Sequence, residues 1–198
     1  MTLDPRPYLR LASASPRRRE LLTSIGVSVE VSPVDLDETP LPGEAPRDHV
    51  LRLARDKAVA GHAAGGPATL GADTVVVVDG RVLGKPRDAG HARSMLETLA
   101  GRSHEVMTGV AVQGPAGLLT RCVVSRVTLR DIPAAEMAAY WRTGEPLDKA
   151  GGYAIQGFGS VFVTHLEGSY SAVVGLPLCE TAEILRRQAV PLWNLPVS

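Results

Sequence analysis

The stretch Leu70–Pro86, LGADTVVVVDGRVLGKP, predicts the strand around which the rest of the chain is organised. Its centre, Thr74–Val78, is short and almost wholly apolar and β-branched, which is typical of a strand buried on both faces. Asp79-Gly80 is a strong hairpin signal, and Arg81–Leu83 supplies the return strand. We therefore expect a central β-hairpin.

Two charged residues flank this hairpin. Asp73 comes directly before the apolar run, and Lys85 follows the return strand in the stiff turn Gly84-Lys85-Pro86. One interpretation is functional, because a carboxylate at the end of a buried strand is poorly placed to decorate a surface. The other is that Asp73 caps a turn and Lys85 is solvated, since turn aspartates are common and buried carboxylates are not. The segment alone favours the second interpretation, and the rest of the chain reverses that preference.

The bulk composition bounds the class of protein. A chain of 198 residues with 44% hydrophobic content is long enough for one compact domain, which we expect to span residues 1–198. Lysine plus arginine and aspartate plus glutamate each total 21, so no overall field attracts nucleic acid or an anionic membrane. Cys122 and Cys179 lie far apart, which argues against a zinc site or a disulfide framework and fits a reducing cytosol. The N-terminus has no long apolar segment of the signal-peptide kind, and no apolar run is long enough to cross a bilayer.

A basic turn opens the first predicted helix. Ser15 suits the N-cap, Pro16 the first helical position and Gly26 the position just past the end. Arg17–Arg19 crowd the first turn, where the helix dipole already presents positive potential and free N–H groups. This placement predicts a bound anion, with a phosphate chain as the natural candidate and the Ser13 hydroxyl as a further donor. The alternative is a solvated basic turn.

An acidic loop and a helical lysine follow. After a predicted strand at Val27–Val34, the segment Asp35–Glu38 carries three carboxylates. Either they line an exposed loop or they hold a divalent cation, since hard metals take carboxylate oxygen. A helix is predicted for Pro46–Gly61, with Lys57 at the edge of its apolar face. Lys57 either snorkels toward water or reaches inward to the same phosphates.

The second half of the chain predicts helices, long strands and a glycine-rich loop. Asp88 caps a helix that Gly101 terminates, and Asp148–Gly157 reads as a loop and short strand. The other predicted elements are strands at Val106–Gln113 and Leu118–Arg130, a helix at Pro133–Thr143, a hairpin turning at Glu167-Gly168-Ser169, and a last helix carrying Ala182, Leu185 and Ala189.

Common nucleotide-binding signatures are excluded. Gly80–Pro86 imitates a Walker A loop but is one residue short, with Pro86 where Ser or Thr should bind magnesium. Gly157-Phe158-Gly159 lacks the third glycine of the dinucleotide fingerprint. The chain also has no nucleophile elbow and no His-x-x-x-His pair.

What remains is an ordered set of short motifs: S-x-S-P-R-R, D-E-T, a helical Lys, G-A-D-T, G-K-P, D-K-A-G-x-Y-x-I-Q-G and V-V-G-L-P-L. In this order and spacing, from about Leu9 to Leu185, the sequence closely resembles the Maf family of nucleoside triphosphate pyrophosphatases. Single motifs are weak, but all of them in register are a strong signal. The resemblance implies an α/β fold related to the ITPase-like pyrophosphatases, with an elongated mixed sheet flanked by helices and two lobes around a deep cleft.

The resemblance also implies an activity: hydrolysis of a nucleoside triphosphate to the monophosphate and diphosphate, dependent on a divalent cation (Mg, Mn or Co), in a cytoplasmic enzyme often found as a homodimer. Asp73 resembles the family's general base, and Lys85 belongs to the same catalytic set. Glu38 and Asp73 are the expected metal-associated carboxylates. A triphosphate carries about four negative charges, so its site needs several cations. The expected substrate-binding residues are Ser13, Arg17, Arg18, Lys57, Thr74, Lys149 and Gln156.

Three positions separate two branches of the family. Arg18, Thr74 and Gln156 all match the branch that acts on dTTP and UTP, whereas the 7-methyl-GTP branch carries different residues there. The Gln156 amide both donates and accepts, which suits the edge of a pyrimidine. Two alternatives stay open: a pyrophosphatase for 7-methyl-GTP or another modified purine nucleotide, and a nucleotide-sensing regulator of septum formation. Intact Asp73 and Lys85 favour an enzyme, since a pure sensor needs no base beside a phosphate site.

Overall fold

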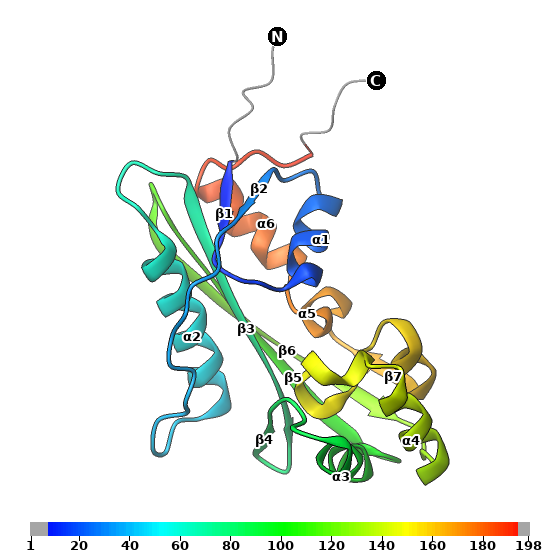
Figure 1. Ribbon diagram of the computed structural model, residues 1–198. Helices are drawn as coiled ribbons and strands as arrows, with labels where there is room; N and C mark the ends of the chain where they lie inside the picture. Colours follow the sequence, from blue (N-terminus) through cyan, green and yellow to red (C-terminus); the bar gives the residue numbers. More distant parts are fainter. Residues whose placement is uncertain (1–7, 194–198) are drawn as a thin grey trace. The chain divides into compact units, whose positions relative to one another are not determined.

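The computed structural model describes residues 8–193; residues 1–7 and 194–198 of the predicted single domain lie outside the described residues. The fold is mixed α/β, as expected. Seven strands form one sheet in the order β2-β1-β3-β5-β6-β7, and β4 pairs with β3 off this path (Figure 1). The described chain divides into two compact units. Unit 1 comprises residues 8–73, 108–122 and 175–193, and unit 2 comprises residues 74–107 and 123–174.

Unit 1 places helices on both faces of a parallel sheet segment. Strand β1 pairs in parallel with both β2 and β3. Its elements are β1 (Leu9–Leu11), α1 (Pro16–Ser24), β2 (Val29–Val31), α2 (Pro46–Gly61), α6 (Leu178–Arg187) and parts of β3 (Ala68–Val78), β5 (Ser103–Gly114) and β6 (Gly117–Leu129). The main core of this unit joins β1 and β3 to α1 and α6.

The side chains of β3 point alternately to the two faces of the sheet, and each face packs against different helices. Leu70 and Ala72 are buried in the core that contains α1 and α6. Gly71 and Asp73 therefore point to the opposite face, because successive side chains of a strand alternate. That face is covered by α2, whose Ala54 and Ala58 pack against Ala111 of β5.

Unit 2 is built around the central hairpin. Its core includes Val76 and Val78 of β3, together with Leu96 and Leu99 of the next helix. Its other elements are β4 (Arg81–Leu83), α3 (Ala89–Leu99), α4 (Ala134–Arg142), the 3₁₀ turns η1 (Glu145–Asp148), η2 (Ala150–Gly152) and η3 (Gly157–Phe162), β7 (Val163–Glu167) and α5 (Tyr170–Val174). Strand β7 pairs antiparallel with β6.

The helix signals of the sequence are confirmed. The Ser15 side chain accepts a hydrogen bond from the backbone N–H of Arg18 at the start of α1, as an N-cap should. Asp88 does the same for His91 at the start of α3, with a distance of 2.8 Å. The predicted hairpin is also present, and Asp79 adopts the left-handed region with φ 50°. No helix in residues 8–193 is long and apolar enough to span a membrane.

Four predictions of local structure were wrong. Strand β3 begins at Ala68, so Asp73 lies within the strand and not before it. The glycine-rich segment forms 3₁₀ turns and no strand, because left-handed glycines break the extended backbone. Glu167-Gly168-Ser169 leads into α5 and turns no hairpin, and Ala189 follows the end of α6 with φ 56°.

Candidate active site

A buried ammonium group links two of the predicted carboxylates in unit 1. Lys57 Nζ donates a hydrogen bond to Asp73 Oδ1 over 3.0 Å and lies 2.6 Å from Glu38 Oε1. The Lys57 and Asp73 side chains are only 9% and 13% exposed, whereas that of Glu38 is 55% exposed. The interpretation of Lys57 as a snorkelling surface residue is therefore wrong. Three residues predicted to serve the site form one charged cluster.

Gly71 explains how the helix brings its lysine to the strand. A Cβ at Gly71 would lie 2.3 Å from the carbonyl oxygen of Ala54 and 2.8 Å from the Lys57 Cβ, so α2 rests directly on the strand backbone. Asp73 is two residues further along β3 and therefore on the same face as Gly71. The Lys57 side chain consequently runs from Gly71 to Asp73 and is buried along its length.

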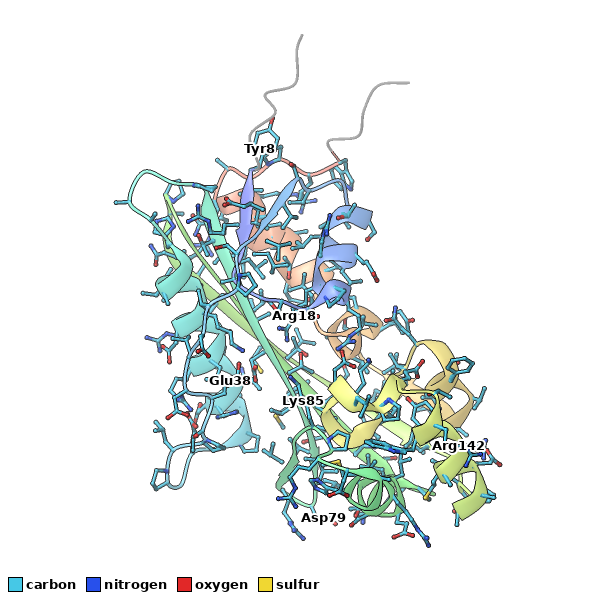
Figure 2. All side chains as sticks on the ribbon, in the orientation of Figure 1. Tyr8, Arg18, Glu38, Asp79, Lys85 and Arg142 are labelled. Carbon is cyan, nitrogen blue, oxygen red and sulfur yellow. The ribbon has the colours of Figure 1, made fainter. Side chains whose placement is uncertain are left out.

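The basic turn at the start of α1 is ordered by the protein itself. Arg18 Nε donates to the carbonyl oxygen of Gly175 over 2.9 Å, and Nη1 donates to Ser13 Oγ over 3.0 Å. Desolvation by burial lowers the pKa of Arg18, while the negative charge of Asp73 raises it. Arg17 lies half-buried in the same turn. Unit 1 thus brings Ser13 and the arginines of α1 to the electrostatic neighbourhood of Asp73; Figure 2 labels Arg18 and Glu38.

A second carboxylate, missed by the sequence analysis, fixes the loop that carries Glu38. Glu44 accepts hydrogen bonds from Arg52 Nε at 2.6 Å and Arg52 Nη2 at 2.8 Å, and from the backbone N–H of Leu41 at 3.0 Å. The same Arg52 Nη2 donates to the carbonyl oxygen of Thr39 over 3.2 Å. The hydrogen bonds from Arg52 hold the pKa of Glu44 well below its ordinary value. The loop is therefore pinned to α2 next to the residue that pairs with Lys57.

Unit 2 holds the remaining predicted residues. Lys85 is exposed in the turn after β4, and Thr74 is half-buried on β3. The backbone N–H of Gly151 donates to the carbonyl oxygen of Gly84 over 2.9 Å, so the Lys85 turn lies beside the loop that follows Lys149. Lys149 Nζ donates to the carbonyl oxygen of Glu145 over 3.2 Å and pairs with Asp148. The structure thus brings the segments of Lys85 and Lys149 together.

Gln156 is half-buried directly before η3, in a segment held by another carboxylate that the sequence analysis missed. Glu145 Oε1 accepts from the Tyr140 hydroxyl at 2.7 Å and from the backbone N–H of Gly159 at 2.9 Å. Glu145 Oε2 accepts from the backbone N–H of Phe158 at 2.9 Å. The sequence signal that could have pointed to Glu145 is its position directly after Gly144, the glycine that ends the preceding helix.

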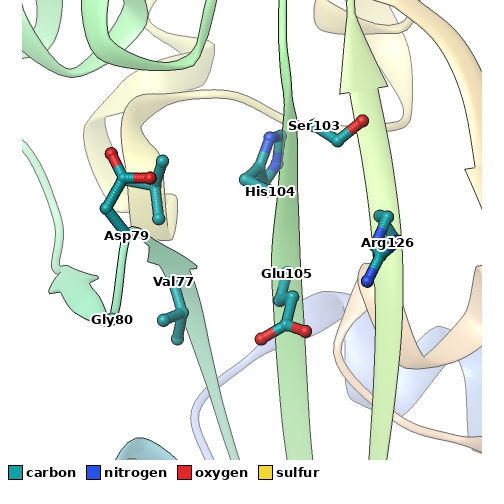
Figure 3. Close-up of a pocket in the computed structure, with 8 residues that line it drawn as sticks. Val77, Asp79, Gly80, Ser103, His104, Glu105 and Arg126 are labelled. Atoms are coloured by element: carbon teal, nitrogen blue, oxygen red, sulfur yellow. The ribbon is translucent and has the colours of Figure 1, made fainter.

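A separate pocket of about 250 Å³ lies on unit 2 (Figure 3). Its polar side chains come from the hairpin and from two neighbouring strands, and Asp79 pairs with Arg102 over 2.5 Å. The lining residues are Val77, Val78, Asp79, Gly80, Ser103, His104, Glu105 and Arg126. None of the predicted site residues lines it.

The donors available for a metal in residues 8–193 do not form a complete protein cage, since no group of three or more His, Cys, Asp or Glu side chains gathers there. Glu38 and Asp73 are nevertheless held close to one ammonium, which shows that this spot favours positive charge. Magnesium commonly binds through one or two carboxylates and substrate phosphates, with water completing its shell. Two neighbouring carboxylates are the number of protein ligands that such an ion commonly takes.

Comparison with known proteins places the chain in a family. The family model described as Maf-like protein matches residues 8–188. A dTTP/UTP pyrophosphatase of Anaeromyxobacter dehalogenans is 54% identical, covering 96% of this chain and 99% of the relative. A dTTP/UTP pyrophosphatase of Saccharophagus degradans is 56% identical, covering 94% and 91%.

Among solved structures, a nucleoside-triphosphatase (dITP/XTP pyrophosphatase) of Mycobacterium abscessus aligns over 91% of this chain and 94% of that one. The two chains are 20% identical, and the TM-score of the alignment is 0.41. The family model matches nearly all described residues, and the two relatives are 54% and 56% identical over almost their whole length. The chain therefore belongs to the Maf-like protein family.

Proposed function

We propose that this protein hydrolyses dTTP and UTP to the monophosphate and diphosphate by attack of water at the α-phosphorus. The observation that carries the proposal is the Lys57 ammonium held between Asp73 and Glu38 at 3.0 and 2.6 Å. This cluster combines a carboxylate able to take a proton, a cation for phosphate and a second carboxylate for metal. The names of the relatives support the substrate choice.

In this proposal Asp73 is the general base. Its place within a strand covered by α2 holds the carboxylate rigidly, which proton abstraction from a positioned water requires. The cations Arg17, Arg18 and Lys57 and the hydroxyl of Ser13 bind phosphate oxygens. Arg18 is the best oriented of them, because Gly175 and Ser13 fix its guanidinium.

Glu38 and Asp73 would hold the divalent cation. When bound, such an ion supplies charge neutralisation for the phosphates and the departing diphosphate. Lys57 neutralises the two carboxylates in the protein alone, so we expect the ammonium to turn toward phosphate when substrate binds.

The roles of the residues in unit 2 stay predictions from the sequence. Lys85 and Lys149 are expected to bind phosphate, and Thr74 and Gln156 to select the base. The adjacency of the Lys85 turn and the segment after Lys149 supports a common role for those two cations. A homodimer and a cytoplasmic location belong to the same proposal and rest on the family resemblance.

The test is a pyrophosphate-release screen of dTTP, UTP, CTP, GTP and 7-methyl-GTP with Mg, Mn and Co. We expect dTTP and UTP to be hydrolysed fastest and CTP less well, because its exocyclic amine replaces an acceptor. Faster hydrolysis of 7-methyl-GTP than of dTTP would overturn the choice of branch. Hydrolysis of no nucleotide with any of the metals would overturn the enzyme itself and favour the sensor.

The position of attack is tested separately with ¹⁸O-labelled water. Attack at the α-phosphorus places the label in the monophosphate, whereas attack at the β-phosphorus places it in the diphosphate. Label in the diphosphate would contradict the proposed mechanism while leaving the activity intact.

A further inference from the structure

We infer that Glu145 is a positioning residue for the base-selecting loop, which it clamps on both sides of Gln156, and that it thereby sets discrimination between pyrimidines. The inference rests on the proposed function of Gln156 as the residue that reads the base. All groups that carry it belong to unit 2. The contacts made by Lys149, Gly151 and Tyr153 hold the start of the motif that contains Gln156, and those made by Glu145 hold its end.

The clamp has two arms. On the C-terminal side, the Glu145 carboxylate accepts hydrogen bonds from the backbone N–H groups of Phe158 and Gly159, both at 2.9 Å. On the N-terminal side, the Tyr140 hydroxyl donates to Glu145 Oε1 at 2.7 Å and accepts from the backbone N–H of Ala154 at 3.0 Å. The carboxylate thus holds Phe158 and Gly159 directly, and it holds Ala154 through the Tyr140 hydroxyl.

The anchor of the clamp is buried and packed. Tyr140 is only 4% exposed, and its ring lies edge to face against Phe162 with ring centroids 5.1 Å apart. Burial works to raise the pKa of Glu145, but the hydrogen bonds from Tyr140, Gly159 and Phe158 hold it below its ordinary value. The carboxylate is therefore ionised at neutral pH, and charged acceptors make the stronger hydrogen bonds.

The loop packs closely against the clamp at two glycines. Gly157 adopts φ +62°, and a Cβ there would lie 2.1 Å from Glu145 Oε2. At Gly159 a Cβ would lie 2.6 Å from the Tyr140 hydroxyl oxygen. Two of the glycines in this segment are thus required by close approach to the clamp.

A neutral isostere breaks the clamp without removing volume. In Glu145→Gln one acceptor oxygen remains for three donors, and the new amide NH₂ faces a backbone or hydroxyl donor. Tyr140→Phe removes only the arm to Ala154. A mutation far from the chemistry that misplaces a binding group by about 1 Å can lower the rate by about 10²-fold. We therefore expect the ratio of kcat/KM for dTTP to kcat/KM for CTP to fall roughly three- to tenfold in Glu145→Gln. The effect should fall mainly on KM, and Tyr140→Phe should show a smaller change in the same direction.

The control is Glu97→Gln, which neutralises an exposed carboxylate of α3 in the same unit, where Glu97 pairs with Arg93 at 2.7 Å. The readouts are kcat and KM for dTTP and CTP, and hydrogen exchange of the segment 154–159 in the full-length protein. We expect faster exchange of this segment in Glu145→Gln than in the control, measured even if the variant is inactive.

Unchanged exchange and unchanged discrimination in Glu145→Gln would overturn the clamp while leaving the proposed function standing. Faster exchange with unchanged discrimination would overturn the assignment to base selection. A wild-type protein that hydrolyses no triphosphate would overturn the proposed function and this inference with it.

Discussion

Replacement of Asp73 by Asn separates catalysis from stability in the charged cluster of unit 1. The amide keeps the shape of the side chain but cannot take a proton, and loss of general-base catalysis lowers kcat by about 10²–10⁴-fold. The expected loss corresponds to roughly 3–5 kcal/mol of transition-state stabilisation, because each factor of ten is worth about 1.4 kcal/mol.

The expected cost in stability is smaller. Breaking a buried ion pair by removing one partner typically costs about 3–5 kcal/mol, since the other charge is left uncompensated. Here Lys57 keeps Glu38 at 2.6 Å, and that carboxylate is half exposed to water. We therefore expect a loss of only about 1–3 kcal/mol in the free energy of unfolding, the usual cost of an impaired buried hydrogen bond.

The assay measures pyrophosphate release at saturating dTTP beside thermal unfolding followed by circular dichroism. Asp56→Asn is the control, since Asp56 lies on α2 with a 50% exposed side chain, 3.9 Å from Arg52. We expect the control to keep the wild-type kcat and Tm. A near-normal kcat in Asp73→Asn would refute the role of this carboxylate as the base.

Three further predictions concern other parts of the molecule. Arg17→Ala should lower kcat/KM for all triphosphates alike, because the variant loses a charged hydrogen bond worth roughly 1.5–3 kcal/mol. Wild-type kinetics in this variant would indicate that Arg17 is solvated and does not contact phosphate. Gln156→Ala should narrow the preference for dTTP over CTP more than it lowers kcat on dTTP; the reverse pattern in steady-state kinetics would contradict base reading. Burial lowers the pKa of His104 to about 4, so the folded protein keeps this ring neutral while the unfolded chain binds a proton below about pH 6.5. The free energy of unfolding should therefore fall by about 3 kcal/mol as pH falls from about 6.5 to 4, and urea titrations should show a flatter dependence in His104→Gln.

The fold was predictable where local signals agree with tertiary packing. Ser15 and Asp88 cap their helices because their short polar side chains reach the free N–H groups of the first turn. The long strand β3 was underestimated, since Ala68–Ala72 has weak strand propensity and is extended only because it pairs with β1. The course of the chain after Gly168 depends on Ser125, whose hydroxyl accepts from the backbone N–H of Ser169, and no local pattern reveals that contact.

The residue types of the charged cluster were predictable from the sequence, and their geometry was less so. The motifs identified Asp73, Lys57 and Glu38. The helical period of the apolar residues placed Lys57 at the edge of the buried face of its helix, because this period cannot reveal that Gly71 of β3 lies against Lys57. The anchors Glu44 and Glu145 were missed for a related reason. Their partners are backbone N–H groups and side chains of other segments, which leave no periodic pattern in the sequence.

The bare backbone under α2 has a consequence for how the molecule tolerates change. Gly71 and Gly109 set the height of the helix above two adjacent strands, where an added methyl group would stand 2.3 and 2.4 Å from the carbonyl oxygens of Ala54 and Val50. Any larger side chain there must lift the helix, and the ammonium of Lys57 would rise out of reach of Asp73. Gly109 is far in sequence from every motif. Even its smallest substitution, Gly109→Ala, is nevertheless expected to displace α2 and so to break the contact between Lys57 and Asp73.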